Sequence, residues 1–171
     1  RENLKPIVIT QPDGASFTLD GGELRWQRWS MRISTHPIDG LVLHQIAYDD
    51  PAPGRIRPIC YRASLSEMVV PYGDPGPLYY WRHVFDAGEA ALGKNTQSLT
   101  FGCDCVGEVH YVDAAMIGHD GQPTVIANAV CIHEEDAGVL WRHADWRSEL
   151  AHVRRSRRLV VSSWANLGNY D

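Results

Sequence analysis

The sequence places one carboxylate in a strongly apolar setting. Asp86 lies in the run VFDAGEAALG, between Phe85 and Ala87 and two positions after Val84. A carboxylate with such neighbours loses hydration, which disfavours its charged form and makes Asp86 a candidate general base. On residue chemistry alone, the favoured reading is that Asp86 caps the short helical turn that follows it. A glycosidase pair of Asp86 and Glu89 is a further reading, although three positions apart the two need not face one cleft.

Two tyrosines occupy settings in which a hydroxyl-bearing ring can have a chemical role. Tyr72 lies in VVPYGDP, where we expect a tight turn, and Tyr170 lies in the final run LGNYD. The Gly168-Asn169 pair before Tyr170 permits unusual backbone geometry. Ordinary packing explains both tyrosines as well, so residue chemistry alone leaves their roles open.

The possible metal ligands form no recognisable local site. No two of the eight histidines are closer than eight positions, which excludes an H-x-H clamp on a strand. The acidic run HEED, at residues 133–136, predicts a turn with hydrogen-bonded carboxylates. The four cysteines include a C-x-C, which is not the C-x-x-C of zinc or redox motifs. Their number fits one disulfide with two free thiols as well as four free thiols.

Composition excludes several classes of function. The net charge is −5, and the one dense basic cluster, residues 154–158, is expected to be a solvated loop entering a strand. We therefore expect no nucleic-acid partner. No apolar stretch is long enough to span a bilayer, and no signal peptide is evident, so no membrane partner is expected. At 171 residues the chain has the length of one domain and can bury roughly two-thirds of its unfolded surface.

The elements that must position these residues are mostly β-strands. Short β-prone runs alternate with Pro-Asp-Gly, Gly-Gly and Ile-Asp-Gly turn signals, and the expected helix is a single short turn. A change of phase in the period-two pattern of residues 23–34 predicts a bulge near positions 28 and 29. The expected strands or strand pairs cover 5–11, 16–21, 23–34, 40–50, 57–70, 99–118, the start of 124–145, and 157–169, with a loop at 74–81, a helical turn at 84–93 and a hairpin turn at 119–123. The predicted class is mainly β, part of a large antiparallel β-sandwich with few short helices.

Taken together, six runs resemble the copper- and topaquinone-dependent primary amine oxidases, and most closely the bacterial members. These runs are KPIVITQPDGASFTLDGGELRWQRWSMRI, YRASLSEMVVPYGDP, VFDAGEAALG, GCDCVGEVHYVDA, CIHEEDAGVLWRH and RRLVVSSWANLGNYD. The most specific run is the last, because Asn169-Tyr170-Asp171 matches the family's Asn-Tyr-Asp/Glu-Tyr motif up to its final tyrosine. The resemblance implies that residues 1–171 are the N-terminal portion of the catalytic β-sandwich domain, truncated within the quinone motif.

The resemblance assigns roles to individual residues. Tyr170 would be the precursor of topaquinone, whose carbonyl takes the substrate amine, and Asp86 would be the base that removes the α-proton. Tyr72 would hydrogen-bond the quinone oxygen, and Asn169 would help fix the tilt of the ring. Cys105 and Cys131 match the family's disulfide, which would leave Cys60 and Cys103 free.

The amine channel would be lined by residues near the base and the quinone motif. The implied substrate-binding residues are Val84, Phe85, Ala87, Gly88, Leu92, Leu167 and Gly168. Val84 stands where some relatives carry an aromatic gate over the quinone, so a wider channel is expected here.

The family reaction converts a primary amine, oxygen and water into an aldehyde, ammonia and hydrogen peroxide. It also requires copper(II), whose three histidine ligands are expected downstream of this chain, so the isolated piece is expected to be inactive. The implied partners are the amine, oxygen, the rest of the oxidase polypeptide and a second subunit in a homodimer. We expect a soluble protein of the bacterial cytoplasm or periplasm. The alternative reading is a non-catalytic β-sandwich module for binding or scaffolding.

Overall fold

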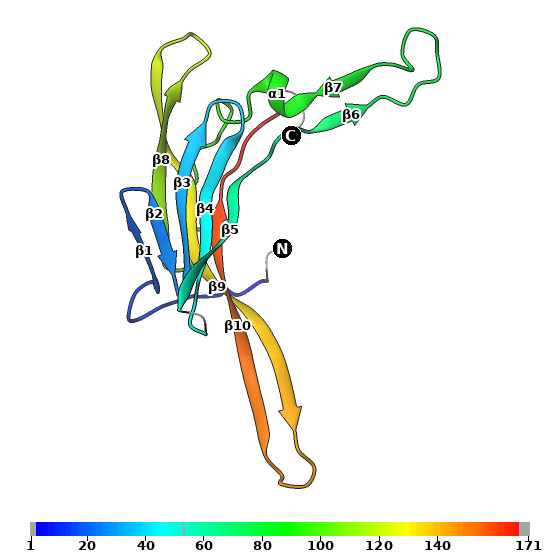
Figure 1. Ribbon diagram of the computed structural model, residues 1–171. Helices are drawn as coiled ribbons and strands as arrows, with labels where there is room; N and C mark the ends of the chain where they lie inside the picture. Colours follow the sequence, from blue (N-terminus) through cyan, green and yellow to red (C-terminus); the bar gives the residue numbers. More distant parts are fainter. Residues whose placement is uncertain (1–2, 53, 168–171) are drawn as a thin grey trace.

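The computed structural model describes residues 3–52 and 54–167, which form mostly antiparallel β-sheet with very little helix (Figure 1). Two sheets make up the body. The five-stranded sheet has the strand order β1-β2-β3-β4-β5, and the three-stranded sheet has the order β10-β9-β8. The predicted class, a mainly β antiparallel fold, is confirmed.

The strands follow one another as hairpins. The five-stranded sheet consists of β1 (Phe17–Asp20), β2 (Glu23–Trp26), β3 (Trp29–His36), β4 (Gly40–Asp50) and β5 (Arg55–Ser64). The three-stranded sheet consists of β8 (His110–Ile117), β9 (Pro123–Ala144) and β10 (Ala151–Ser162). A separate hairpin of β6 (Val69–Pro71) and β7 (His83–Phe85) leads into the helix α1 (Asp86–Ala90).

The sandwich core lies between the two sheets. Leu24 of the first sheet and Ile132 of the second are fully buried and belong to one apolar cluster, which also holds Phe17 and Val130. Met31 packs against this cluster, as the period-two pattern of residues 23–34 predicts. Burial of apolar surface between the sheets therefore holds β2 and β9 face to face.

Three sequence predictions about strands are wrong. The expected bulge near residue 28 is a two-residue hairpin, because Trp26 pairs with Trp29 and Gln27 adopts a positive φ of 53°. Residues 5–11 form no strand, and in the run 99–118 only β8 is a named strand. These segments are apolar enough for sheets, but they are held by loop hydrogen bonds such as that from the Leu99 amide to Asn128 O.

The predictions for β9 and β10 also need correction. β9 continues through the HEED run to Ala144, and its outer half pairs only with β10. HEED is therefore strand and not a turn. The basic cluster lies within β10 and not in a loop, and Arg155 forms a two-nitrogen ion pair with Asp136 across the ladder.

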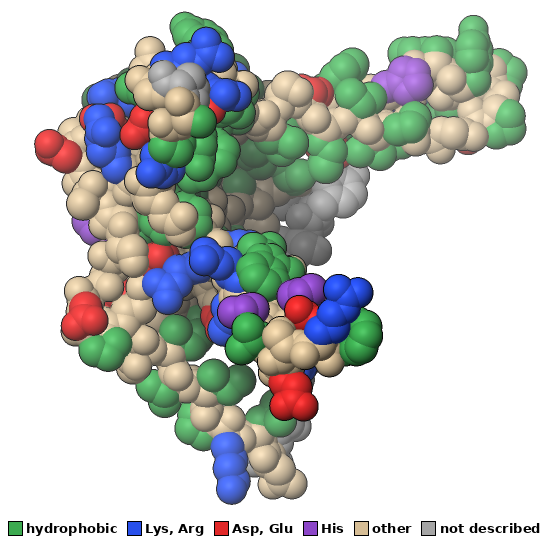
Figure 2. All heavy atoms as spheres, turned by 60° about the horizontal axis from the view of Figure 1, so that its bottom comes forward, with side chains coloured by type: hydrophobic (Ala, Val, Ile, Leu, Met, Phe, Trp, Pro, Cys, Tyr) green, Lys and Arg blue, Asp and Glu red, His purple; other side chains and the backbone are tan. Residues whose placement is uncertain are grey.

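Two hairpins project from the body (Figure 1). One is the outer half of β9 and β10. The other is β6–β7, whose surface is largely hydrophobic in the space-filling view (Figure 2) and exposes Leu78, Tyr80 and Trp81. Within the described residues, no helix has the length and apolar character needed to cross a membrane.

Candidate functional site

Asp86 is the first residue of α1 and follows β7 directly. Its backbone amide donates a hydrogen bond to Met68 O at 3.0 Å. Met68 immediately precedes β6, so this bond holds the start of the helix against the first strand of the hairpin. The N-cap position belongs to Phe85, and no side chain caps the helix. The capping role for Asp86 is therefore wrong, and its half-buried carboxylate is left available for chemistry.

The neighbours of Asp86 differ in burial. Ala87 is buried and Val84 is half-buried, whereas the Phe85 ring is largely exposed. The amide of Gly88 donates to Glu67 Oε1 at 3.1 Å, and the Glu67 carboxylate lies where a Cβ on Gly88 would fall. A glycine at this position therefore lets the first turn of α1 lie close against the segment before β6.

Tyr72 lies in the stem of the β6–β7 hairpin and not in a tight turn. Its amide donates to Arg82 O at 3.4 Å, and the chain reverses further out, between Gly76 and Arg82. The reversal is closed by backbone hydrogen bonds from the amides of Tyr79 and Tyr80 to the carbonyl oxygen of Gly76, the residue before Pro77. About half of the Tyr72 surface is exposed.

The chain that leads to Tyr170 runs beside the segment that follows α1. The Gln97 amide donates to Trp164 O at 2.7 Å, and the Asn166 amide donates to Asn95 O at 3.1 Å. A bridge between Thr96 and Ala165 lies between these two bonds. Residues 164–166 are therefore held against residues 95–97. The latter segment begins five positions after the end of α1. Gly168, Asn169 and Tyr170 lie outside the described residues.

A cavity of about 400 Å³ opens at this junction. Two of the expected substrate-binding residues, Leu92 and Leu167, form part of its wall together with Thr96 and Ala165. Asp86 and Tyr72 are not among its lining residues, so within the described part of the chain the expected site residues are divided between the cavity and the adjoining hairpin.

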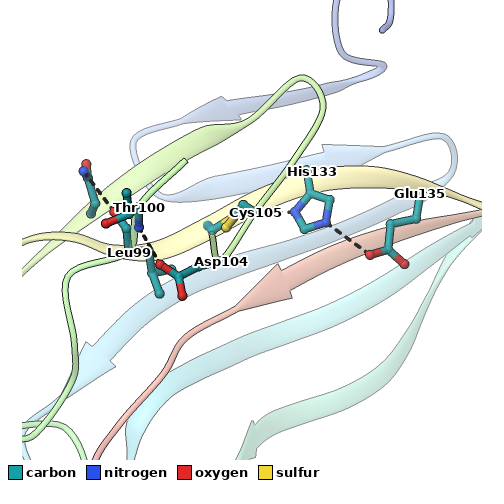
Figure 3. The surroundings of a disulfide bond; sticks show 8 residues. Leu99, Thr100, Asp104, Cys105, His133 and Glu135 are labelled. Atoms are coloured by element: carbon teal, nitrogen blue, oxygen red, sulfur yellow. Dashed lines mark hydrogen bonds and ion pairs between the residues drawn. A yellow bond between two sulfur atoms is a disulfide. The ribbon is translucent and has the colours of Figure 1, made fainter. Parts of the chain in front are cut away.

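The disulfide joins Cys105 to Cys131, as the resemblance implies, and Cys60 and Cys103 are free. The bond ties the loop before β8 to the buried centre of β9. Figure 3 shows His133 beside it, with Nδ1 at 3.3 Å from Cys131 Sγ and Nε2 at 3.3 Å from Glu135 Oε1. Sequence reasoning missed this group, although a C-x-H spacing on a strand places both side chains on one face.

Glu134, on the opposite face of β9, is a buried carboxylate whose side chain is only 2% exposed. Its oxygens accept hydrogen bonds from Trp26 Nε1 at 2.9 Å, Gln11 Nε2 at 2.6 Å and the Ser16 amide at 2.8 Å. Burial opposes ionisation and would raise the pKa, but these donors outweigh it and lower the pKa of Glu134 from 4.5 to about 2. The expectation of hydrogen-bonded carboxylates in HEED is therefore confirmed, on a strand.

The described residues offer little for a metal ion. The group of Cys105, Cys131 and His133 is the only set of three or more potential ligands found there with donor atoms close enough for one ion. The described part of the chain therefore does not form a three-histidine copper site, and copper has no part in the residue roles considered below. For topaquinone the described surroundings offer room, since a cavity lies beside the segment that leads to Tyr170.

Comparison with known proteins identifies the family. The model of the copper amine oxidase enzyme domain matches residues 18–171. A histamine oxidase of Arthrobacter globiformis is 49% identical over 100% of this chain and 25% of its own length. A copper-containing diamine oxidase of Nicotiana tabacum, named peroxisomal, is 51% identical over 100% of this chain and 22% of its own length. With bacterial and peroxisomal relatives at similar identity, the comparison points to no single compartment.

Solved structures agree with the sequence comparison. A copper-containing benzylamine oxidase from Hansenula polymorpha superposes with a TM-score of 0.82 at 37% identity, covering 95% of this chain and 25% of that one. The chain thus spans about a quarter of the length of these relatives. Because the family match runs over nearly the whole sequence and the sandwich is shared, the chain belongs to the copper amine oxidase family.

Proposed function

We propose that the complete protein oxidises primary amines, and that this chain supplies the catalytic base and the quinone tyrosine. The overall reaction is that a primary amine, oxygen and water give an aldehyde, ammonia and hydrogen peroxide. The observation that carries the proposal is the hydrogen-bonded contact between residues 95–97 and 164–166. This contact brings the segment after the Asp86 helix alongside the approach to Tyr170, next to a cavity of about 400 Å³.

Tyr170 would carry the quinone, which when formed would supply a carbonyl and a two-electron acceptor for the amine. Asp86 acts on the substrate carbon next to the nitrogen, where a carboxylate oxygen removes the proton. Its half-buried position is compatible with this role, because the carboxylate is neither fully exposed to solvent nor sealed away from a substrate. Met68 O holds the backbone of Asp86, so the side chain starts from a fixed point on α1.

Tyr72 and Asn169 orient the ring in this proposal. The Tyr72 hydroxyl would donate a hydrogen bond to the quinone, and Asn169, the residue before Tyr170, would help to orient the ring. Tyr72 lies on the stem of the β6–β7 hairpin, and the same hairpin carries Asp86 at its end, so one element positions both groups.

The amine channel is proposed to be wide and mainly apolar. Val84 is a small, half-buried side chain paired with Val70 at the end of the hairpin. Leu92 and Leu167 supply apolar walls to the cavity at the junction of residues 95–97 and 164–166. Phe85, Ala87, Gly88 and Gly168 complete the proposed lining. Such a channel admits amines that carry bulky apolar groups.

The remaining parts of the enzyme are also proposals. Residues 1–171 would be the N-terminal portion of the catalytic sandwich domain, with copper(II) held by the rest of the polypeptide. The active form would be a homodimer, as the resemblance implies.

The test is the Asp86→Asn variant of the complete protein. We expect amine turnover to fall by at least about a hundredfold, because the base is lost. Quinone formation, read from colour and from titration with phenylhydrazine, should persist. The matched control is Glu89→Gln, three positions along the same helix and exposed, which should keep full turnover.

Three results would contradict the proposal. Normal turnover in Asp86→Asn would remove this residue from the base role. A coloured, phenylhydrazine-reactive protein after Tyr170→Phe would show that the quinone comes from another residue. Absence of amine turnover in the copper-loaded wild-type protein would instead favour the non-catalytic module.

A further inference from the structure

A histidine and a carboxylate lie in line behind the Cys105–Cys131 bond (Figure 3). Cys131, His133 and Glu135 alternate along β9, so their side chains leave the same face of the strand. His133 Nδ1 is 3.3 Å from Cys131 Sγ, and His133 Nε2 is 3.3 Å from Glu135 Oε1. The two sulfurs and the imidazole nitrogen all lie within 4.8 Å of one another.

Two polar atoms in this cluster lack a good partner. His133 is only 5% exposed, and a disulfide sulfur has no proton to give and accepts hydrogen bonds weakly, so Nδ1 has no strong contact. Tyr111 pairs with Cys131 in the β8–β9 ladder and packs against the apolar cluster of Leu99, Cys105 and Cys131. Its buried hydroxyl has no hydrogen-bond partner among the described residues. Buried polar atoms are normally satisfied, so this cluster has unused capacity to bind a ligand.

We infer that reduction of the disulfide creates a buried site in which Cys105, Cys131 and His133 bind a thiophilic divalent metal ion, with Zn²⁺ as the preferred occupant. Two thiolates and an imidazole form a donor set that suits zinc. The 3.3 Å between His133 Nδ1 and Cys131 Sγ is close to the roughly 3.5 Å that separates nitrogen and sulfur ligands on tetrahedral zinc. The Cα atoms of the two cysteines are 6.9 Å apart, which leaves room for the sulfurs to separate to the required distance of about 3.8 Å.

Glu135 prepares the imidazole for this role. By accepting a hydrogen bond from Nε2–H, its carboxylate favours the tautomer whose Nδ1 lone pair faces the sulfurs. A histidine ligand with a carboxylate behind its second nitrogen is the usual arrangement at zinc sites. The fourth position is left to water.

The reaction needs a reductant and releases protons. A dithiol reduces the Cys105–Cys131 bond to two thiols and is itself oxidised to a disulfide. Zn²⁺ then replaces the two thiol protons, which are released to solvent. Reoxidation expels the metal, so disulfide and zinc exclude each other at this site.

The experiment compares the complete protein in oxidised form with protein produced in a reducing cytosol and never oxidised. Thiol titration confirms that the second sample has two more free thiols than the first, as reduction of the Cys105–Cys131 bond requires. Co²⁺ alone is the probe, because a thiolate-to-cobalt charge-transfer band reports sulfur ligation and a histidine copper site gives none. We expect this band in the reduced protein only, with one additional Co²⁺ bound and displaced by one Zn²⁺.

Variants separate this site from adventitious thiol binding. The double variant Cys60→Ser/Cys103→Ser should keep the band, since neither residue belongs to the cluster. His133→Gln should weaken zinc binding by more than about a hundredfold, and Glu135→Gln by about tenfold. Circular dichroism of the oxidised variants checks that the fold is intact.

A reduced protein without the band would overturn the inference. So would a band of full strength in His133→Gln, or one that disappears in Cys60→Ser/Cys103→Ser. Amine turnover does not enter this readout, so the outcome is independent of the proposed oxidase activity.

Discussion

Because Glu134 is buried and hydrogen-bonded, the free energy of unfolding should fall at low pH. The Glu134→Gln variant tests this dependence. The carboxylate is 2% exposed and accepts from Trp26 on one oxygen and from Gln11 and Ser16 on the other. Glutamine has the same shape but only one acceptor oxygen. Whichever way its amide is turned, an NH₂ group faces at least one of these donors.

The magnitude follows from the pKa. The donors lower the pKa of Glu134 from 4.5 to about 2, a depression of about 2.5 units. At about 1.36 kcal/mol per unit, ionisation of Glu134 stabilises the fold by about 3 kcal/mol near neutral pH. Because the folded pKa is depressed, this stability is fully present above pH 4.5 and is lost as the pH falls through about 2. Near pH 3, about half of it should remain.

The assay is urea unfolding of wild-type and Glu134→Gln protein at about pH 7 and about pH 3, followed by tryptophan fluorescence. We expect the variant to be less stable by about 3 kcal/mol at the higher pH, and by about half of that at the lower pH. Glu135→Gln is the control on the same strand, and it should change stability by less than about 1 kcal/mol because Glu135 is half exposed. An equal loss at both pH values would refute the reasoning, since the effect would then come from packing and not from charge.

Three further changes test other parts of the structure. Cys105→Ser should lower the free energy of unfolding by about 3 kcal/mol, because it opens a loop with a sequence separation of 26, whereas Cys103→Ser should leave it unchanged. A denaturant titration that ranks the two serine variants equally would contradict this. Val84→Tyr should narrow the proposed channel, so kcat/KM in the complete protein should fall more for a bulky arylalkylamine than for methylamine; a uniform fall would show that Val84 does not gate the channel. Leu24→Ala should cost about 2–5 kcal/mol, because Leu24 is fully buried between the sheets, and a thermal midpoint close to wild type would place the core elsewhere.

The sequence was most informative where local pattern and tertiary environment agree. β4 runs over residues 40–50 as predicted, because apolar alternation and flanking turn signals define a strand without reference to the rest of the chain. The helical turn at Asp86 and the hairpin turn between β8 and β9 were also predicted, because their signals too lie within a few neighbouring residues. The hairpin at Gln27 was not, since it lacks the Asn-Gly or Gly signal that such turns usually carry.

The environment of Glu134 could not have been predicted from the sequence near it. Its donors are 108 to 123 positions away along the chain, so no local spacing announces them. For the same reason, an acidic run within a strand was mistaken for a turn. Residue chemistry and the resemblance both single out Asp86, but no local pattern predicts the contact between residues 95–97 and 164–166, because it joins distant parts of the chain.

Successive side chains of β9 point to opposite faces and need different partners. The register of β9 with its neighbouring strands therefore determines whether those partners are within reach. A shift by a single residue would turn His133 towards Trp26 and would send Glu134, without its donors, into the loop that holds Cys105. Such a misaligned strand would bury an unsolvated negative charge. The disulfide at Cys131 prevents that shift, and it therefore determines that Glu134, and not its neighbour Glu135, is the buried carboxylate.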